Sequence, residues 1–203
     1  MGEHTATDQA EPWYVELHGT LRTGLAAKVD EMVDAVQRVV FFGGNVRSWD
    51  NCGTQVLLPA PNNDAIFVFT HFLKHFYRED MTIRQICDWV RLLWTYRDKI
   101  DVRLLEKRLR RAGLMSEWKS FAALVVEYLG MQVEAMPMYS PDKKWKKKGG
   151  KIMSFILKGY SGVRLRDTLA VARIFPYKTL RYSPSIFLNV NWLKVKERMF
   201  GQR

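Results

Sequence analysis

A chain of 203 residues is long enough to bury a core and suits one domain, or one domain and a fragment of another. Its hydrophobic content of 47% and aromatic content of 13% exclude wholesale disorder. The net charge of +11 favours anionic partners such as nucleic acid, nucleotide phosphates or acidic membrane, although an ordinary soluble protein with a basic surface explains it equally well.

The first residues, the apolar runs and the two cysteines predict the cellular compartment of the protein. The first residues are polar and acidic, which predicts no signal peptide, and no apolar run is long enough to span a bilayer. Cys52 and Cys87 follow no spacing typical of a metal site or a disulfide framework. We therefore expect a cytoplasmic protein without a transmembrane segment.

The first predicted elements are a strand, a helix and a hairpin. Alternation over residues 12–18 predicts a strand with Glu16 and His18 on one face. A helix is predicted from Asp30, as its N-cap, to residue 42, where two glycines end it. Two short strands, at residues 45–49 and 54–58, then flank an Asp-Asn-Cys-Gly turn and predict a β-hairpin.

The clearest break in the chain is Pro-Ala-Pro-Asn-Asn-Asp at residues 59–64, where we expect Asn63 or Asp64 to cap the next helix. We place a domain boundary there. Residues 1–60 would be part of an α+β domain, and residues 61–203 would be helical. The predicted fold class is therefore α+β and predominantly helical, with a strand and hairpin preceding a helical domain.

Residues 67–118 predict three consecutive helices, because apolar side chains recur at spacings of three and four. One of them, over residues 82–97, has a polar stripe in which Asp88 lies one turn from Arg84 and one turn from Arg91. Such charges are expected to pair, so the stripe has either a purely structural role or a role in substrate binding.

A pair of histidines, His71 and His75, shares one face of the preceding predicted helix. The pair could supply two zinc ligands, but no third ligand is evident except Asp88. A structural polar cluster, in which Asp88 accepts a hydrogen bond from one histidine, is the favoured interpretation. A substrate-facing role is the remaining alternative.

The later part of the chain predicts further helices around a basic segment. Asp101 and Gly113 cap a short helix with arginines in its last turn, and another helix over residues 114–129 follows. A lysine-rich loop is predicted near residues 141–151, where Trp145 stands among five lysines. A solvated loop is favoured over a phosphate-binding segment with an exposed indole. Residues 152–157, 164–175 and 185–200 predict additional helices, with Pro176 as a break between two of them.

Three strings carry a resemblance to a known family: HFLKHFY at residues 71–77, IRQICDWVRLLWTYRD at residues 83–98, and LLEKRLRRAGLMSEWKSFAALVVEYLGM at residues 104–131. They resemble the C-terminal half of a bacterial family of uncharacterised nucleotidyltransferases, common in Bacteroidetes. The resemblance runs from the VELHGTL segment to ARIFP. It implies metal-dependent transfer of a nucleoside monophosphate from a nucleoside triphosphate to an unknown acceptor.

The resemblance also implies roles for single residues. Glu16 takes the place of the third carboxylate of the active site, which would hold Mg²⁺ together with two others. It is the candidate catalytic and metal-binding residue, although an exposed edge-strand glutamate explains it without any function. The candidate substrate-binding residues are His18, Arg84, Asp88, His71 and His75.

The chain departs from the family in one respect, because the Gly-Ser turn and the Asp-x-Asp pair that supply the other two carboxylates do not occur in this sequence. One carboxylate does not neutralise two metal ions. We therefore expect a truncated chain that is inactive as written. The alternative is a non-catalytic, basic helical module that binds nucleic acid or a protein partner carrying the missing half.

Overall fold

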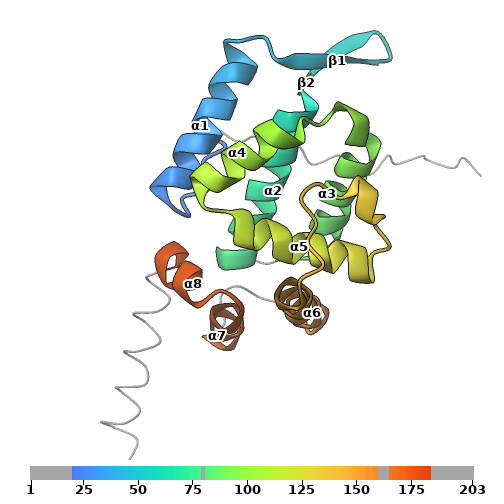
Figure 1. The fold of residues 1–203 in the computed structure, drawn as a ribbon. Helices are drawn as coiled ribbons and strands as arrows, with labels where there is room; N and C mark the ends of the chain where they lie inside the picture. The colour runs from blue at the N-terminus through green and yellow to red at the C-terminus, as the bar shows by residue number, and fades with distance from the viewer. Residues whose placement is uncertain (1–19, 79–80, 160–164, 184–203) are drawn as a thin grey trace, which may run out of the picture.

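The computed structural model describes residues 20–78, 81–159 and 165–183, and it shows helices with one antiparallel hairpin (Figure 1). The predicted class, α+β and predominantly helical, is confirmed. The described elements are α1 (Ala27–Phe41), β1 (Val46–Asn51), β2 (Thr54–Pro59), α2 (Pro61–Arg78), α3 (Ile83–Thr95), η1 (Arg97–Lys99), α4 (Val102–Ala112), α5 (Met115–Tyr128), η2 (Val133–Ala135), α6 (Lys143–Leu157), α7 (Leu165–Ile174) and α8 (Pro176–Tyr182).

Helix α1 begins earlier than predicted, because Asp30 does not cap it. The N-cap is Ala26, which makes no side-chain capping hydrogen bond. The Asp30 carboxylate instead accepts hydrogen bonds from the N–H and hydroxyl of Thr23 and from the N–H of Gly24. The predicted N-cap was wrong because this carboxylate binds the incoming chain rather than the free N–H groups of its own helix.

The hairpin is confirmed, with longer strands and a tighter turn than predicted. Its last pair joins Asn51 to Thr54, so the loop consists of Cys52 and Gly53 alone. Both loop residues have positive φ, at 52° and 87°. Two successive left-handed residues are typical of a type I′ turn, whose twist matches that of paired strands.

Arg47 joins the hairpin to the helices. Its guanidinium donates to the Pro59 carbonyl at 3.0 Å, to the Tyr96 hydroxyl at 2.6 Å and to the Asp64 carboxylate at 2.7 Å. It also lies 4.5 Å above the centre of the Tyr96 ring. Burial raises the pKa of Asp64, although the bond from Arg47 opposes that shift. The hairpin is thereby held at one end of α2.

Helix α2 begins at Pro61, so neither Asn63 nor Asp64 caps it, contrary to prediction. Proline suits the first helical position because its missing N–H would have had no partner there. The amide of Asn62 exchanges two hydrogen bonds of 2.8 Å with the backbone of Asp101. The polar residues of this turn therefore hold neighbouring elements in place.

Helix α2 supplies the aromatic centre of the core. The ring of Phe69 lies 4.7 Å from that of Trp118 and 5.4 Å from that of Trp89, between centroids. One and two turns on, Phe72 and Phe76 pack against Phe121 at 4.9 and 5.4 Å. These rings come from α2, α3 and α5, so a single aromatic cluster joins the three helices.

Helices α3 and α4 follow the predicted pattern closely. In α3, the apolar residues Ile86 and Leu93 are buried, whereas Trp94 is 41% exposed. Helix α4 begins after Asp101, whose carboxylate accepts a hydrogen bond from the helix, and ends at Gly113 with φ 73°. The predicted caps of α4 are confirmed.

The lysine-rich segment, predicted as a loop near residues 141–151, instead forms the first half of α6. Lysine is a good helix former, and buried residues such as Ile152 turn one face of this helix inward. The alternative of a phosphate-binding segment with an exposed indole is not supported either, because Trp145 is half-buried. Lys144 and Lys148 lie over its ring at 4.6 and 5.6 Å.

The helices form one continuous buried core. Figure 1 shows α2 in the middle, with α6, α7 and α8 on the side of α5 away from α4. Buried apolar residues extend without a break from Leu25, ahead of α1, to Tyr182 at the end of α8. The core thus includes residues on both sides of residue 60, and the division into domains 1–60 and 61–203 stays a prediction.

The remaining predicted elements lie towards the chain ends. The predicted helix at residues 164–175 corresponds to α7, and Pro176, expected as a break, begins α8. The strand at residues 12–18 and the helix at residues 185–200 lie outside the described residues. Among the helices of the described part, none is long and apolar enough to cross a membrane.

Candidate functional site

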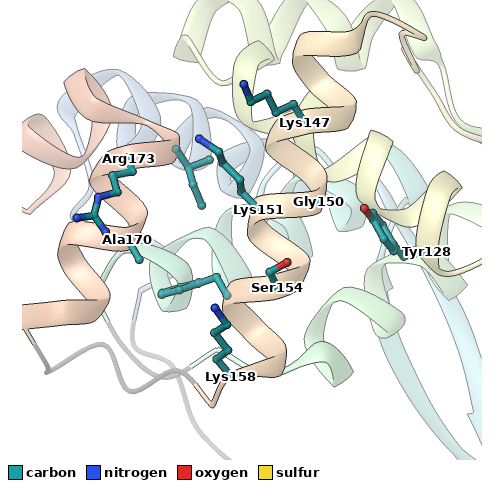
Figure 2. Close-up of a pocket in the computed structure, with 10 residues that line it drawn as sticks. Tyr128, Lys147, Gly150, Lys151, Ser154, Lys158, Ala170 and Arg173 are labelled. Atoms are coloured by element: carbon teal, nitrogen blue, oxygen red, sulfur yellow. The ribbon is translucent and has the colours of Figure 1, made fainter.

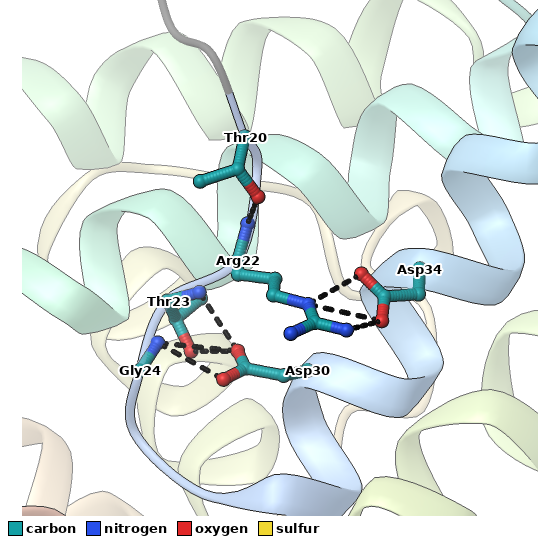
Figure 3. Close-up of polar contacts among 6 residues, drawn as sticks. All are labelled: Thr20, Arg22, Thr23, Gly24, Asp30 and Asp34. Carbon is teal, nitrogen blue, oxygen red and sulfur yellow. Dashed lines mark hydrogen bonds and ion pairs between the residues drawn. The ribbon is translucent and has the colours of Figure 1, made fainter.

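Residues 20–24 lead into α1 and are fixed against it by two carboxylates (Figure 3). Arg22 donates three hydrogen bonds to the two carboxylate oxygens of Asp34, with its Nε 2.9 Å from Oδ1. Thr23 donates to Asp30 from its N–H and its hydroxyl, at 2.8 and 2.9 Å. The bond from Arg22 lowers the pKa of the Asp34 carboxyl, so both partners stay charged at neutral pH.

The same segment and α2 enclose a small pocket of about 40 Å³. Helix α2 contributes Phe67, His71 and Lys74, which lie on one face because they are four and three residues apart. Thr20 and Arg22 line the opposite side. This volume holds a single small group, such as a water or a phosphate oxygen, and two cationic side chains and an imidazole surround it.

Two of the pocket residues, Arg22 and Lys74, were not among the predicted site residues. Lys74 could have been found, because it lies one turn after His71 on the same helical face. Arg22 carried no such signal, since its position depends on the carboxylate of Asp34 in α1.

The two predicted histidines are brought together by α2. Their Nε2 atoms lie 3.2 Å apart, so one imidazole donates a hydrogen bond to the other in the neutral pair. His71 lines the pocket and His75 lies one turn further along α2. The expected hydrogen bond with Asp88 is wrong, because within the described part of the chain Asp88 is exposed on α3 and bonds to neither histidine.

The polar stripe of α3 points to solvent. Arg84, Asp88 and Arg91 are all exposed, and among the described residues no ion pair links them. The expected charge pairing is therefore wrong, since exposed side chains gain little from being held in one geometry. Arg91 instead lines a shallow groove between α3 and the residues that follow α5.

The described residues do not fit the magnesium site that the family resemblance implies. Within residues 20–78, 81–159 and 165–183, no three metal-binding side chains converge. Asp30 and Asp34, which hold the pocket-lining residues Arg22 and Thr23, are both occupied by hydrogen bonds from residues 22–24. The candidate ligand Glu16, like His18, lies outside the described residues.

A buried ionic cluster, which the sequence did not reveal, joins α2, α5 and α8. The Glu117 carboxylate is fully buried and lies 3.2 Å from Nζ of Lys178. It also accepts hydrogen bonds from the hydroxyls of Ser116 at 2.6 Å and Tyr77 at 3.3 Å. Burial, with the nearby Glu117 charge, raises the pKa of Tyr77 well above its ordinary value. The cluster thus links three helices through buried polar contacts.

The described residues thus form a helical protein in which the approach to α1 and the face of α2 enclose a basic pocket. A family model described as uncharacterised nucleotidyltransferase matches residues 3–130, more than half of the chain. The chain therefore belongs to this family of nucleotidyltransferases. No curated protein and no solved structure matches it.

Proposed function

We propose that this protein binds a nucleoside triphosphate with one of its phosphate oxygens at the pocket between residues 20–23 and α2. The observation that carries the proposal is the convergence of Arg22, His71 and Lys74 on one small space. Phosphate oxygens accept hydrogen bonds from cationic groups and from imidazole N–H groups. Membership of a nucleotidyltransferase family supplies the class of substrate.

The covalent chain supports the same location for the predicted catalytic residue. Glu16 precedes Thr20, which lines the pocket, by only four residues in the sequence. We propose Glu16 as the metal-side carboxylate and His18 as a substrate contact. Arg84 and Asp88 remain proposed substrate contacts, because their exposure on α3 leaves them accessible.

Nucleotidyl transfer requires carboxylates that hold a metal ion, in addition to a site for the nucleotide. Magnesium is the cofactor that family membership implies, and the printed sequence has no Asp-x-Asp pair to help hold it. We therefore propose that this chain binds the nucleotide, and that transfer to an acceptor requires two further carboxylates, for example from a partner protein. Nucleotide binding at the α2 pocket does not depend on that step.

Equilibrium dialysis with each of the four α-³²P-labelled ribonucleoside triphosphates tests the proposal. We expect saturable binding to the wild-type chain and a loss of about tenfold in affinity for Lys74→Gln, because one charge-assisted phosphate contact is removed. Lys99→Gln is the matched control, since Lys99 is an exposed lysine in η1 that does not line the pocket.

Two outcomes would contradict the proposal: no triphosphate is retained, or Lys99→Gln weakens binding as much as Lys74→Gln does. Incubation of the same protein with Mg²⁺ and a cell extract then separates binding from transfer. A labelled product that forms with the wild-type chain and not with Glu16→Gln would show that transfer depends on Glu16 of this chain.

A further inference from the structure

A second basic site lies on the opposite side of α5, in the groove between α6 and α7 (Figure 2). It has a volume of about 590 Å³, within the range of ligand-binding pockets. Four exposed cations line it, and the described lining residues include no carboxylate: Lys147, Lys151, Lys158 and Arg173. The groove lies almost wholly beyond residues 3–130, so the family match assigns it no function.

The lysines of this region differ in whether they already contact a partner side chain. Outside the groove, Lys146 pairs with Glu127 at 2.7 Å, and Lys148 lies 4.5 Å above the ring of Phe175. Inside the groove, Lys147 forms no ion pair with any residue that the structure describes, and the same holds for the other three cations. Like charges one turn apart destabilise a helix, so an unpaired row of this kind suits an external anion.

The row is extended rather than convergent. Lys147 and Lys151 share one face of α6, and Lys158 follows directly after the last residue of that helix. Lys158 is eleven positions after Lys147, which corresponds to about 16 Å at the rise of an α-helix. Arg173, on α7, lines the other side of the groove (Figure 2). A line of charges of this length matches several linked phosphates better than one phosphate group.

An aromatic ring completes the groove. Tyr128 lies beside Gly150 in Figure 2 and is 53% exposed. A Cβ atom at Gly150 would lie 2.8 Å from the Tyr128 hydroxyl, so the glycine makes room for this side chain against α6. An exposed ring beside a row of cations is the arrangement on which unpaired bases stack in proteins that bind single strands.

Another basic groove, between α1 and α4, is less suited to a polyanion. Its lining includes the Glu31 carboxylate beside Lys107, Arg108 and Arg111. Arg108 is also engaged, because it donates a hydrogen bond of 3.0 Å to Asn63. Substitution of two cations in this groove therefore serves as a control for substitution of two cations in the α6–α7 groove.

We propose that the α6–α7 groove binds a single nucleic-acid strand, with its phosphates along Lys147, Lys151, Lys158 and Arg173 and a base against Tyr128. This binding requires neither nucleoside triphosphate nor metal. It is therefore independent of the pocket on α2 and of the transfer reaction.

Fluorescence anisotropy of the full chain with labelled 12-nucleotide oligouridine and oligothymidine tests the proposal, without nucleotide or metal. We expect the logarithm of the binding constant to fall with the logarithm of salt concentration with a slope of about −3, as for four phosphate contacts on a single strand. The double variant Lys147→Gln, Lys151→Gln should halve that slope and weaken binding at least about tenfold at 0.1 M salt. A preference between the two oligomers would distinguish RNA from DNA.

Two further variants separate the groove from net charge and from misfolding. Lys107→Gln, Arg111→Gln removes the same charge from the α1–α4 groove and should change affinity by less than about threefold. Tyr128→Ala should weaken binding by about tenfold and leave the salt slope unchanged. Circular dichroism would verify that each variant is folded.

Three results would overturn the proposal. They are no binding of either oligomer, equal losses in the groove and control variants, and saturable calorimetric binding of inorganic pyrophosphate without any binding of the oligomers. The last result would make the groove a site for a small anion.

Discussion

At the residue scale, the ion pair between Lys178 and Glu117 makes the sharpest prediction about stability. Lys178 also donates to the Gly113 carbonyl and, at 3.0 Å, to the Tyr182 hydroxyl. Lys178→Met would leave a fully buried carboxylate without its cation, which should lower the free energy of unfolding by about 3 kcal/mol. Urea denaturation measures this change. Arg110→Met, which removes the exposed pair with Glu106, should cost less than about 0.5 kcal/mol.

The effect of Lys178 should depend on pH in a defined direction. Burial lowers its pKa, but the Glu117 charge and the Tyr182 hydroxyl outweigh burial and leave the pKa above its ordinary value of 10.5. The folded state therefore holds this proton more tightly than the unfolded chain does. The stabilisation is present below pH 10.5 and is lost as pH rises through the folded pKa. A difference between wild type and Lys178→Met that grows above pH 10.5 would contradict this account.

At the scale of the element, two adjacent glycines in α6 make a matched pair. A Cβ at Gly149 would lie 2.8 Å from the backbone nitrogen of Leu124 and 3.0 Å from the carbonyl of Ser120. Gly149→Ala should therefore push α6 away from α5 and lower stability by about 2 kcal/mol, even though alanine favours the helix. The Cβ at Gly150 would meet only the movable hydroxyl end of Tyr128.

Gly150→Ala should accordingly be neutral or stabilise the protein by up to about 1 kcal/mol, the gain in helix propensity. Urea unfolding of both variants provides the comparison. Equal stabilities for the two alanine variants would show that the contact between α5 and α6 is looser than the structure has it.

At the scale of the whole molecule, the continuous core predicts one cooperative unfolding transition. Val29, Val33 and Val36 of α1 are fully buried, and this helix packs against α2 and α4. Residues 1–60 and 61–203 should therefore unfold together, and a chain of residues 61–203 should have a midpoint several degrees lower because the surface under α1 is exposed. Calorimetry measures both quantities. Two separate transitions, or an unchanged midpoint for residues 61–203, would support independent domains instead.

Much of the local structure could be predicted from the sequence, because its causes are local. The caps of α4, Asp101 and Gly113, and the period of apolar residues in α3 depend on neighbours within one or two turns. The hairpin around Cys52 and Gly53 was predictable for the same reason. The composition of the lysine-rich segment was misleading, because its buried face becomes evident only where α6 meets α5.

The candidate sites, by contrast, were decided by contacts between distant parts of the chain. The sequence alone determined the family resemblance, the histidine pair and the basic charge. Only the tertiary structure placed Arg22 beside Lys74, Lys178 beside Glu117, and Arg173 opposite the lysines of α6. Helical periodicity specifies which side chains share a face, whereas the pairing of faces depends on how complementary surfaces pack, and packing involves residues that no local pattern relates.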